Sequence, residues 1–407
     1  MLCGLLGQSL KHSYSPQIHN QLGEYEYRLF EKDPDQLQDF LENSEFTGIN
    51  VTIPYKKSVL PFCRQLTPEA KKLGAVNTIV RLEDGSLLGH NTDYFGFRSM
   101  VDRSGVSVSG KKVLVLGSGG ASNTVCAVMN ELNANVIVIS RSGENSYKNL
   151  HLHSDAAIIV NTTPVGTYPD THLSPIDLDI FPALEAVFDL IYNPARTRLL
   201  LDAEKRNLKT ENGLYMLVAQ AKESSALFQG KLLNDSVILP IYQSLKQQIE
   251  NIVLIGMPGC GKSTIGKLLA EKTGKRFVDV DAEITAQVKC PISDIFLNHG
   301  EAYFRQLETD VLSKLGKLSG LVIATGGGCV TQMRNYDHLH QNGSIIWLQR
   351  NIDILPTEGR PLSIGADLHV MYCTRKPLYS SFADYTVSND GTADNTAKNI
   401  LKVLDWK

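Results

Sequence analysis

The stretch NIVLIGMPGCGKSTIGKLLAEKTG (Asn251–Gly274) predicts the fold of the second part of the chain. It opens on a continuous apolar run, which is typical of a strand buried on both faces of a parallel sheet. The loop that follows, Gly256–Ser263, fits the pattern G-x-x-x-x-G-K-[ST] between a strand and a helix. Backbone N–H groups of such a loop cradle phosphates. We therefore expect a parallel α/β domain with a nucleotide site of the P-loop kind.

Each residue of this loop has an expected role. Lys262 would neutralise β- and γ-phosphate oxygens, and the Ser263 hydroxyl would bind Mg²⁺. Downstream, FVDVDAEI places Asp279 and Asp281 two residues apart at a strand end, which puts both on one face. One could bind Mg²⁺ and the other a substrate hydroxyl, although such a pair is often only a polar strand end without a ligand. The nucleotide-binding residues expected here are Gly256, Met257, Pro258, Gly259, Cys260, Gly261, Lys262, Ser263 and Thr264.

Further motifs follow the P-loop. In FRQLE, Arg305 and Glu308 lie three residues apart and share a helix face, which alone would indicate a surface ion pair. Three consecutive glycines, Gly326–Gly328, suit a loop whose backbone touches a ligand. Arg360 lies in TEGRPLS, a segment without clear period that is typical of a mobile lid. Arg375 precedes KPLY and, taken alone, could be an arginine at a helix end.

A second glycine-rich turn lies in KKVLVLGSGGASNTVCAVMNEL (Lys111–Leu132). Gly117–Ser122 ends a strand and opens a helix, where free N–H groups can hold a pyrophosphate, although a tight turn without ligand fits too. The next strand ends at Arg141, where an NAD site usually has Asp or Glu. A guanidinium suits a 2′-phosphate and favours NADP, unless Arg141 is simply a solvated strand-end residue.

Length and pattern predict the domain organisation. The 407 residues suggest two or three domains. A polar helix, IYQSLKQQIEN, precedes the P-loop unit, so we expect the main boundary near residues 246–250. Residues 1–100 carry an α/β pattern of their own ahead of the turn unit that starts at Lys111. The expected architecture is an N-terminal α/β lobe, a Rossmann-like lobe, and a parallel P-loop domain like that of nucleoside-monophosphate kinases.

Composition excludes several classes of function. With 40 Lys and Arg against 43 Asp and Glu, the net charge is −3, so no positive field favours nucleic acid or a membrane surface. No run reaches ~18 apolar residues, and MLCGLLGQSLKHSYSP has no basic n-region, so neither a membrane span nor a secretory signal is expected. Seven cysteines without a C-x-x-C spacing indicate reduced thiols in a cytoplasm.

Residues from about 250 to 407 resemble shikimate kinase through GMPGCGKST, DVD, FRQLE, ATGGG, GRPL and TRKPLY, in the family's order. The resemblance implies that Asp281 holds the shikimate hydroxyl that attacks the γ-phosphate and that Asp279 joins Ser263 at Mg²⁺. It also implies that Arg305 and Arg375 clamp the shikimate carboxylate. The triple glycine, Gly326, Gly327 and Gly328, would line the same pocket, and Arg360 would be the lid cation that meets ATP.

Residues 1–246 resemble shikimate dehydrogenase through GQSLKHSYSP, GINVTIPYKK, GAVNT, GHNTD, GSGGAS, NTTPVG, DLIYNP and NGLYMLVAQA. The resemblance implies a substrate lobe of 1–100 plus 222–246 and an NADP lobe of 101–221. Lys56 and Asp93 look like the catalytic pair, although alone they would read as a solvated loop charge and a helix N-cap. The implied substrate ligands are Ser13, Ser15, Thr52, Asn77, Tyr192 and Gln220. The implied cofactor ligands are Gly117, Gly119, Gly120, Ala121, Ser140, Arg141, Ser142, Thr162 and Gly213.

The sequence departs from these families in two places. Only residues 142–156 separate Arg141 from the strand AAIIVN, where the dehydrogenase family has an extra helix and strand. The NADP lobe is therefore trimmed, and a second arginine for the 2′-phosphate is not evident. In the kinase half, Asn351–Gly359 holds no basic residue and is short for the family's lid. Arg350 is a candidate substitute for the missing lid charge.

Together these resemblances predict a fusion of two consecutive shikimate-pathway enzymes. The first would reduce 3-dehydroshikimate with NADPH, and the second would phosphorylate shikimate with ATP and Mg²⁺. Shikimate, the product of one half and the substrate of the other, links the two assignments. Two alternatives stay open: quinate or shikimate oxidation with NAD in the first half, and a non-catalytic fusion of nucleotide-sensing modules.

Overall fold

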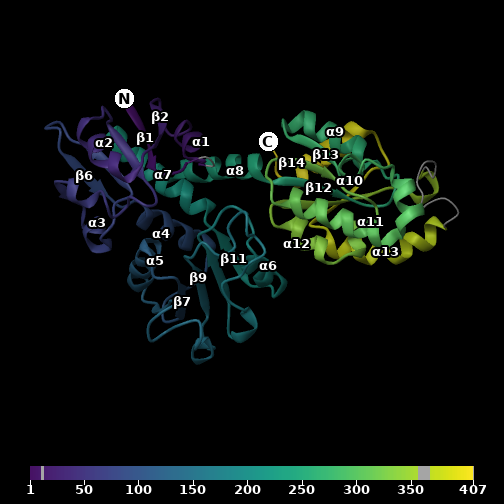
Figure 1. Cartoon of the computed structure of the whole chain (residues 1–407), viewed down its shortest axis with the longest axis horizontal. Helices are drawn as coiled ribbons and strands as arrows, with labels where there is room; N and C mark the ends of the chain where they lie inside the picture. Colours follow the sequence, from purple (N-terminus) through teal and green to yellow (C-terminus); the bar gives the residue numbers. More distant parts are fainter. Residues whose placement is uncertain (11–12, 356–366, 407) are drawn as a thin grey trace. The chain divides into compact units, whose positions relative to one another are not determined.

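The computed structural model describes residues 1–10, 13–355 and 367–406 of the chain. The chain divides into two compact units (Figure 1). The first holds Met1–Tyr192 and Leu199–Leu245, and the second holds Asn193–Arg198 and Lys246–Lys407. Helix α8 (Ile238–Ile249) contains the point at which the chain passes from the first unit to the second.

The first sheet of unit 1 is mixed and six-stranded, with the order β2-β1-β3-β5-β6-β4. Strands β1 and β3 pair in parallel at its centre, and all their residues except Leu2 are buried. The strands are β1 (Leu2–Gly7), β2 (Glu26–Glu31), β3 (Gly48–Val51), β4 (Gln65–Leu66), β5 (Thr78–Arg81) and β6 (Leu87–His90). The helices of this part are α1 (Ser15–His19), α2 (Leu37–Asn43) and α3 (Pro68–Leu73).

The second sheet of unit 1 is parallel and five-stranded, with the order β11-β10-β9-β7-β8. Its strands are β7 (Lys112–Leu116), β8 (Asn135–Ile139), β9 (Ile158–Asn161), β10 (Ala186–Asp189) and β11 (Lys209–Asn212). Helices α5 (Gly120–Glu131) and α6 (Arg198–Lys205) belong to this layer, while α4 (Asp93–Ser104) and α7 (Leu214–Gln229) pack against each other. The parallel order and the glycine turn after β7 are those of a Rossmann-like lobe.

Unit 2 is a parallel sheet with the order β13-β14-β12-β15-β16. Its strands are β12 (Asn251–Ile255), β13 (Arg276–Asp279), β14 (Leu321–Ala324), β15 (Gly343–Gln349) and β16 (Tyr385–Ser388). Its helices are α9 (Lys262–Thr273), α10 (Val280–Val288), α11 (Ile292–Gly316), α12 (Arg334–His340), α13 (Leu368–Phe382) and α14 (Ala393–Val403). Figure 1 shows α9 on one side of the sheet and α11 and α12 on the other, so β12 is covered on both faces. The expected α/β class is confirmed.

A short segment far from the rest of unit 2 in sequence belongs to it. The backbone N–H of Ala195 donates to Asn342 Oδ1 over 2.8 Å, and that of Arg196 donates to the Gln341 carbonyl over 2.8 Å. The Arg196 side chain donates to the His340 carbonyl over 3.0 Å, and Arg198 pairs with Asp337 over 2.7 Å. Residues 193–198 are therefore held by α12 and by the turn that precedes β15.

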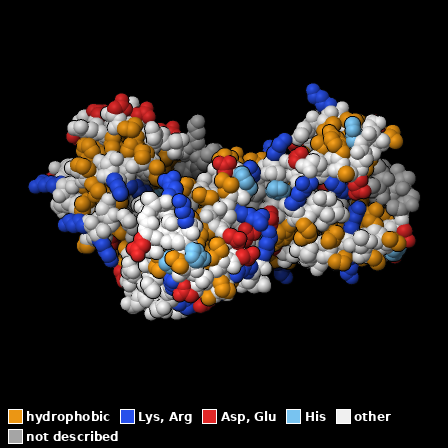
Figure 2. All heavy atoms as spheres, turned by 60° about the horizontal axis from the view of Figure 1, so that its bottom comes forward, with side chains coloured by type: hydrophobic (Ala, Val, Ile, Leu, Met, Phe, Trp, Pro, Cys, Tyr) orange, Lys and Arg blue, Asp and Glu red, His pale blue; other side chains and the backbone are white. Residues whose placement is uncertain are grey.

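The surface carries both signs of charge. On the face that Figure 2 shows, Lys and Arg side chains are interspersed with Asp and Glu side chains. This mixture matches the net charge of −3. Among the described residues, no helix is both long and apolar enough to cross a membrane.

Candidate active sites

The P-loop of unit 2 connects β12 to α9. Its two turns need glycine: Gly256 has φ 143°, and a Cβ there would lie 2.5 Å from the Leu348 carbonyl oxygen, while Gly261 has φ 99° at the N-cap of α9. No side chain caps α9, so its first N–H groups remain available to an anion. The Lys262 ammonium donates to the carbonyls of Gly256 and Met257 over 2.8 and 3.0 Å. The loop thus presents the amides and the cation that a polyphosphate requires.

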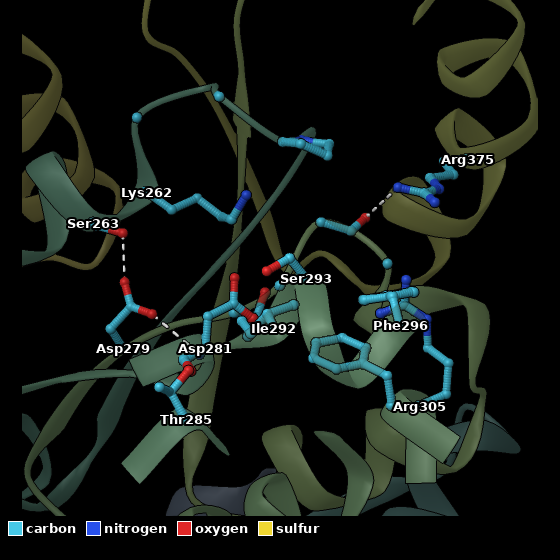
Figure 3. Close-up of a pocket in the computed structure, with 18 of the residues that line it drawn as sticks. Lys262, Ser263, Asp279, Asp281, Thr285, Ile292, Ser293, Phe296, Arg305 and Arg375 are labelled. Carbon is cyan, nitrogen blue, oxygen red and sulfur yellow. Dashed lines mark hydrogen bonds between the residues drawn. The ribbon is translucent and has the colours of Figure 1, made fainter. Parts of the chain in front are cut away.

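Two oxygen groups meet beside the loop. The Ser263 hydroxyl donates to Asp279 Oδ2 over 2.6 Å (Figure 3). Asp279 ends β13 and is the N-cap of α10, where its Oδ1 accepts from the backbone N–H of Asp281 and Ala282. The two aspartates therefore lie across a strand-to-helix turn, and the expectation that both lie on one strand face is wrong. Both aspartates still line one cavity. The turn from β13 into α10, and not the alternation of a strand, brings their side chains to the same side.

Asp281 is a buried acceptor without a donor. Its Oδ1 has no hydrogen-bond partner. Burial, and then the nearby Asp279 charge, raise the pKa of Asp281, whereas Lys262 and Arg305 lower it. An unsatisfied buried carboxylate oxygen costs free energy unless a ligand supplies a donor. Asp281 is therefore poised to accept a hydrogen bond from a hydroxyl in the cavity.

Arg305 and Glu308 form a buried ion pair rather than the surface pair that their spacing alone would indicate. Arg305 Nη1 donates to Glu308 Oε2 over 2.7 Å, and their side chains are 6% and 0% exposed. Arg305 also donates to Glu301 on the same helix. Burial raises the pKa of Glu308, and the Arg305 charge opposes this shift. The guanidinium is thus held in one orientation by two carboxylates while Arg305 also lines the cavity.

The triple glycine, Gly326–Gly328, packs directly against the side chains of Arg305 and Glu308. A Cβ on Gly328 would lie 2.1 Å from Arg305 Nη2, and one on Gly326 would lie 2.3 Å from Glu308 Oε1. Arg375, in the middle of α13 and not at a helix end, donates to the Gly327 carbonyl over 3.1 Å. Because no side chain larger than hydrogen fits, both arginines can lie close to the same backbone.

These residues share a cavity of about 720 Å³. Figure 3 shows Ser263 and Asp279 at one end, Arg305 and Arg375 at the other, and Lys262 and Asp281 between them. Apolar walls come from Ile292, Phe296 and Phe304, and Arg350 also lines the cavity. Met257, Cys260 and Gly256 are not among the lining residues and act as loop framework. Arg360 and the segment TEGRPLS lie outside the described residues, and of the expected lid segment 351–359 only residues 351–355 are described.

A second cavity, of about 730 Å³, lies in unit 1. At its wall the Lys56 ammonium donates to Asp93 Oδ2 over 2.6 Å, and the Asn77 amide donates to Asp93 Oδ1 over 2.9 Å. Asp93 is the first residue of α4, after the N-cap residue Thr92, so the alternative that it is the N-cap is wrong. The carboxylate fixes Lys56 at the edge of a space large enough for a small ring acid.

The predicted substrate ligands surround this pair. All of them line the cavity: Ser13, Ser15, Thr52, Lys56, Asn77, Asp93, Tyr192 and Gln220. They come from the loop before α1 and its first residue, the loop after β3, the residue before β5, the start of α4, the loop after β10, and α7. Ala121 and Gly213, which we expected at the cofactor, also line this space. The cavity therefore adjoins the start of α5, where the glycine turn lies.

The glycine turn itself opens onto a third cavity, of about 640 Å³. Gly117 has φ 106°, and a Cβ there would lie 2.8 Å from Thr162 Oγ1, which is why the turn needs glycine. The expected residues that line it are Gly117, Gly119, Ser140, Arg141 and Thr162. Gly120 and Ser142 do not line it. Tyr147, which sequence reasoning missed, does, and its phenol is partly buried beside Arg141.

The comparisons with known proteins identify both parts. Residues 258–405 match the family model described as shikimate kinase, and residues 5–79 match that of the shikimate dehydrogenase substrate binding domain. The chain is 34% identical over 268 residues to the shikimate dehydrogenase (NADP(+)) of Clostridium perfringens strain SM101, covering 60% of this chain and 98% of that protein. The chain belongs to the shikimate dehydrogenase family. Residues 258–405 add a shikimate kinase domain, which makes the chain a bifunctional shikimate-pathway enzyme.

Solved structures show the same likeness. A chorismate mutase/shikimate 5-dehydrogenase fusion protein from Clostridium acetobutylicum is 33% identical with a TM-score of 0.58, covering 60% of this chain and 97% of that one. The shikimate 5-dehydrogenase of Thermus thermophilus, solved with NADP(H) and shikimate, is 31% identical with a TM-score of 0.55, covering 60% and 99%. Dehydrogenases of this family therefore share the fold of unit 1.

The segment between β8 and β9, which we expected to be trimmed, lies at the third cavity. Among the described residues between β8 and β9, the only helical turn is the 3-10 turn Leu150–His153, and β8 is the edge of its sheet. Residues 143–149 form a loop held by its own bonds: Ser140 N–H to the Asn145 carbonyl, Ser146 N–H to Asn149 Oδ1, and Asn149 Nδ2 to the Glu144 carbonyl. This loop places Tyr147 in the cavity wall.

Proposed function

We propose that the two halves perform consecutive reactions on one carbon skeleton. The first reduces 3-dehydroshikimate to shikimate with NADPH, and the second converts shikimate to shikimate 3-phosphate with ATP and Mg²⁺. One observation supports this proposal most directly. In each cavity, groups that can bind an anion lie near one group that can give or take a proton. This last group is Lys56 in the dehydrogenase and Asp281 in the kinase domain.

In the dehydrogenase cavity, hydride is supplied by NADPH. We assign Lys56 as the group that gives a proton to the carbonyl oxygen or stabilises its negative charge, because its ammonium lies at the cavity edge. Asp93 holds the ammonium in place. Ser13 and Ser15 would bind the carboxylate, and Thr52, Asn77, Tyr192 and Gln220 the ring substituents.

In the kinase cavity, the phosphoryl group is supplied by ATP. We assign Asp281 to the shikimate hydroxyl, which it orients and from which it accepts the proton. Arg305 and Arg375 would hold the carboxylate at the far end of the cavity, where planar guanidinium groups favour bidentate contacts. Lys262 would offset charge on the phosphates between these ends. We also assign Arg360 to the phosphoryl group that is transferred, as the resemblance implies.

The residues present fit the cofactors. Ser263 and Asp279 are oxygen groups 2.6 Å apart, the kind of pair that Mg²⁺ takes beside a phosphate. The uncapped start of α9 suits the phosphates of ATP, and the turn after β7 with Arg141 suits NADP. A cytoplasmic location is supported by the seven free cysteines.

A coupled assay of the full chain tests the proposal. With 3-dehydroshikimate, NADPH and MgATP, we expect NADPH loss followed by shikimate 3-phosphate. Lys56→Ala should abolish the first signal while added shikimate is still phosphorylated, and Asp281→Asn should do the reverse. Nucleotide binding without turnover would support the sensor alternative, and faster turnover of quinate with NAD would support the oxidation alternative.

A further inference from the structure

Behind the dehydrogenase cavity lies a buried cluster of three hydroxyl groups. Thr78 Oγ1 lies 2.8 Å from Ser224 Oγ and 3.2 Å from Thr92 Oγ1, and Thr92 Oγ1 lies 2.9 Å from Ser224 Oγ. The exposed fractions of the three residues are 0%, 3% and 0% for Thr78, Thr92 and Ser224. They come from β5, the N-cap of α4 and the middle of α7. The cluster therefore joins the surroundings of Asn77, Asp93 and Gln220, because Asn77 directly precedes β5, Asp93 begins α4 and Gln220 lies on α7.

Donors and acceptors around Ser224 are ordered. Its hydroxyl donates to the carbonyl of Gln220, one turn earlier on α7, over 3.0 Å. It accepts from the Asn50 amide over 2.8 Å. The other end of the Asn50 amide, Oδ1, accepts from the Tyr27 hydroxyl over 2.8 Å. Ser224 therefore ties α7, and with it Gln220, to β3.

The cluster continues to the catalytic pair through Asn77. Asn77 Oδ1 accepts from the backbone N–H of Thr92 over 2.7 Å and from Thr78 Oγ1 over 3.1 Å. A backbone N–H can only donate, so the amide nitrogen of Asn77 must face the carboxylate of Asp93. Asp93 then holds Lys56 over 2.6 Å. Thr92 completes a path of hydrogen bonds from Ser224 to the Lys56 ammonium. Thr92 Oγ1 lies 2.9 Å from Ser224 Oγ and accepts from Asn77 Nδ2 over 3.0 Å, and the same Nδ2 donates to Asp93 over 2.9 Å.

We propose that Ser224 and Thr78 are positioning residues for the reduction. Their hydroxyls hold the side chains of Asn77, Asp93 and Lys56 in fixed positions relative to one another. They also fix the position of Gln220 at the cavity wall. This inference rests on the proposed function of that cavity and extends it to residues that do not line it. Loss of either hydroxyl leaves the path free to shift. A displacement of about 1 Å at reacting groups can lower the rate roughly 10²-fold.

The neighbouring Ser225 supplies a matched control. It lies on the same helix, is equally buried, and its hydroxyl accepts from Tyr25 over 2.7 Å and from Gln229 over 2.8 Å. Neither Tyr25 nor Gln229 takes part in the hydrogen bonds that reach Asp93. Removal of either serine hydroxyl takes one buried hydroxyl from α7, but only Ser224 belongs to the path.

The experiment compares Ser224→Ala and Ser225→Ala in the full chain, following kcat, KM and the pH profile of 3-dehydroshikimate reduction with melting temperature. We expect kcat to fall about 10- to 100-fold in Ser224→Ala, with a shifted pH profile. Ser225→Ala should lose comparable thermal stability while keeping its kcat and pH profile. Equal losses of kcat in both variants, or an unchanged kcat in Ser224→Ala, would overturn the proposal.

A second pair keeps the test decisive if Ser224→Ala does not fold. Thr78→Ser keeps the hydroxyl, and Thr78→Val keeps the shape without it, so activity should survive only in the first. Equal activity in the two variants would contradict the positioning role. A wild-type chain without turnover would instead contradict the proposed function. Calorimetric binding of 3-dehydroshikimate to the same variants would then decide, with weaker binding expected only where the hydroxyl is lost.

Discussion

The Ser263 hydroxyl donates a 2.6 Å hydrogen bond to the Asp279 carboxylate. The same carboxylate caps α10 through its other oxygen. One side chain therefore performs two tasks that a substitution can separate, because asparagine caps a helix as well as aspartate does but carries no charge.

Asp279→Asn should leave the fold of the kinase domain intact and weaken its use of Mg²⁺. We expect the Mg²⁺ concentration for half-maximal phosphorylation to rise by about 10-fold or more, since hard cations prefer charged oxygen ligands. Titration of Mg²⁺ at fixed ATP measures this shift, and dehydrogenase turnover of the same sample is the internal control. An unchanged Mg²⁺ dependence would remove Asp279 from the metal site.

The pKa of Asp281 is raised by burial and by Asp279, and this should appear in the pH profile of phosphorylation. A raised pKa means that the carboxylate takes up a proton at a higher pH than an ordinary aspartate, whose pKa is about 3.9. Activity that needs the carboxylate should therefore decline, as the pH falls, at a higher pH than the protonation of an ordinary aspartate would give. The measurement is kcat/KM for shikimate against pH, and a flat profile down to pH 4 would contradict it.

Lys56→Ala should lower the reduction rate by about 10²–10⁴-fold, the usual cost of losing one acid–base group. The adjacent Lys57 is exposed and does not line the cavity, so Lys57→Ala is the matched control and should be mild. Steady-state rates with 3-dehydroshikimate and NADPH decide the matter. If Lys57→Ala is the damaging change, the assignment has chosen the wrong lysine.

Arg141→Asp should weaken NADPH far more than NADH, because only NADPH carries the 2′-phosphate that a guanidinium attracts and a carboxylate repels. A charge-assisted hydrogen bond contributes about 1.5–3 kcal/mol, so roughly 10- to 100-fold in kcat/KM is expected. Lys148→Asp makes the same change of charge on the exposed loop, outside the cavity wall, and should do little. Equal losses for both cofactors would show that Arg141 does not meet the phosphate.

Residues 246–407, produced alone, should phosphorylate shikimate but melt below the same unit in the full chain. The fragment lacks residues 193–198, whose backbone and arginines bond to Asn342, Gln341, His340 and Asp337. Each lost kcal/mol lowers the melting temperature of a domain of 150–250 residues by about 2–4 °C. Arg196→Ala in the full chain should likewise lower the melting temperature of unit 2. A fragment as stable as the intact chain would show that the segment adds nothing.

The two glycine loops could be predicted because their residues are local: strand, turn and helix follow one another in sequence. The burial of Arg305 and Glu308 could not, because a spacing of three residues is the same for a surface pair and a core pair. Only the packing of α11 against the triple glycine separates these cases.

Contacts between distant residues set the other limit. Thr78 and Ser224 are 146 positions apart, and no local pattern links them. The segment 193–198 reads as the end of a dehydrogenase motif, yet it belongs to the second unit. Tyr147 reaches its cavity because the loop of residues 143–149 folds back on itself through its own hydrogen bonds, and no sequence motif marks such a loop.

Asp281 Oδ1, buried and without a donor, has a consequence for the order of the two proposed reactions. Shikimate offers this oxygen an O–H, but 3-dehydroshikimate carries a ketone at the same ring position, and a ketone oxygen has only lone pairs to present. Two acceptors facing each other in a buried site repel. Given the proposed role of Asp281, we expect 3-dehydroshikimate to bind the kinase cavity more weakly than shikimate does, so that accumulation of the unreduced precursor should inhibit phosphorylation little.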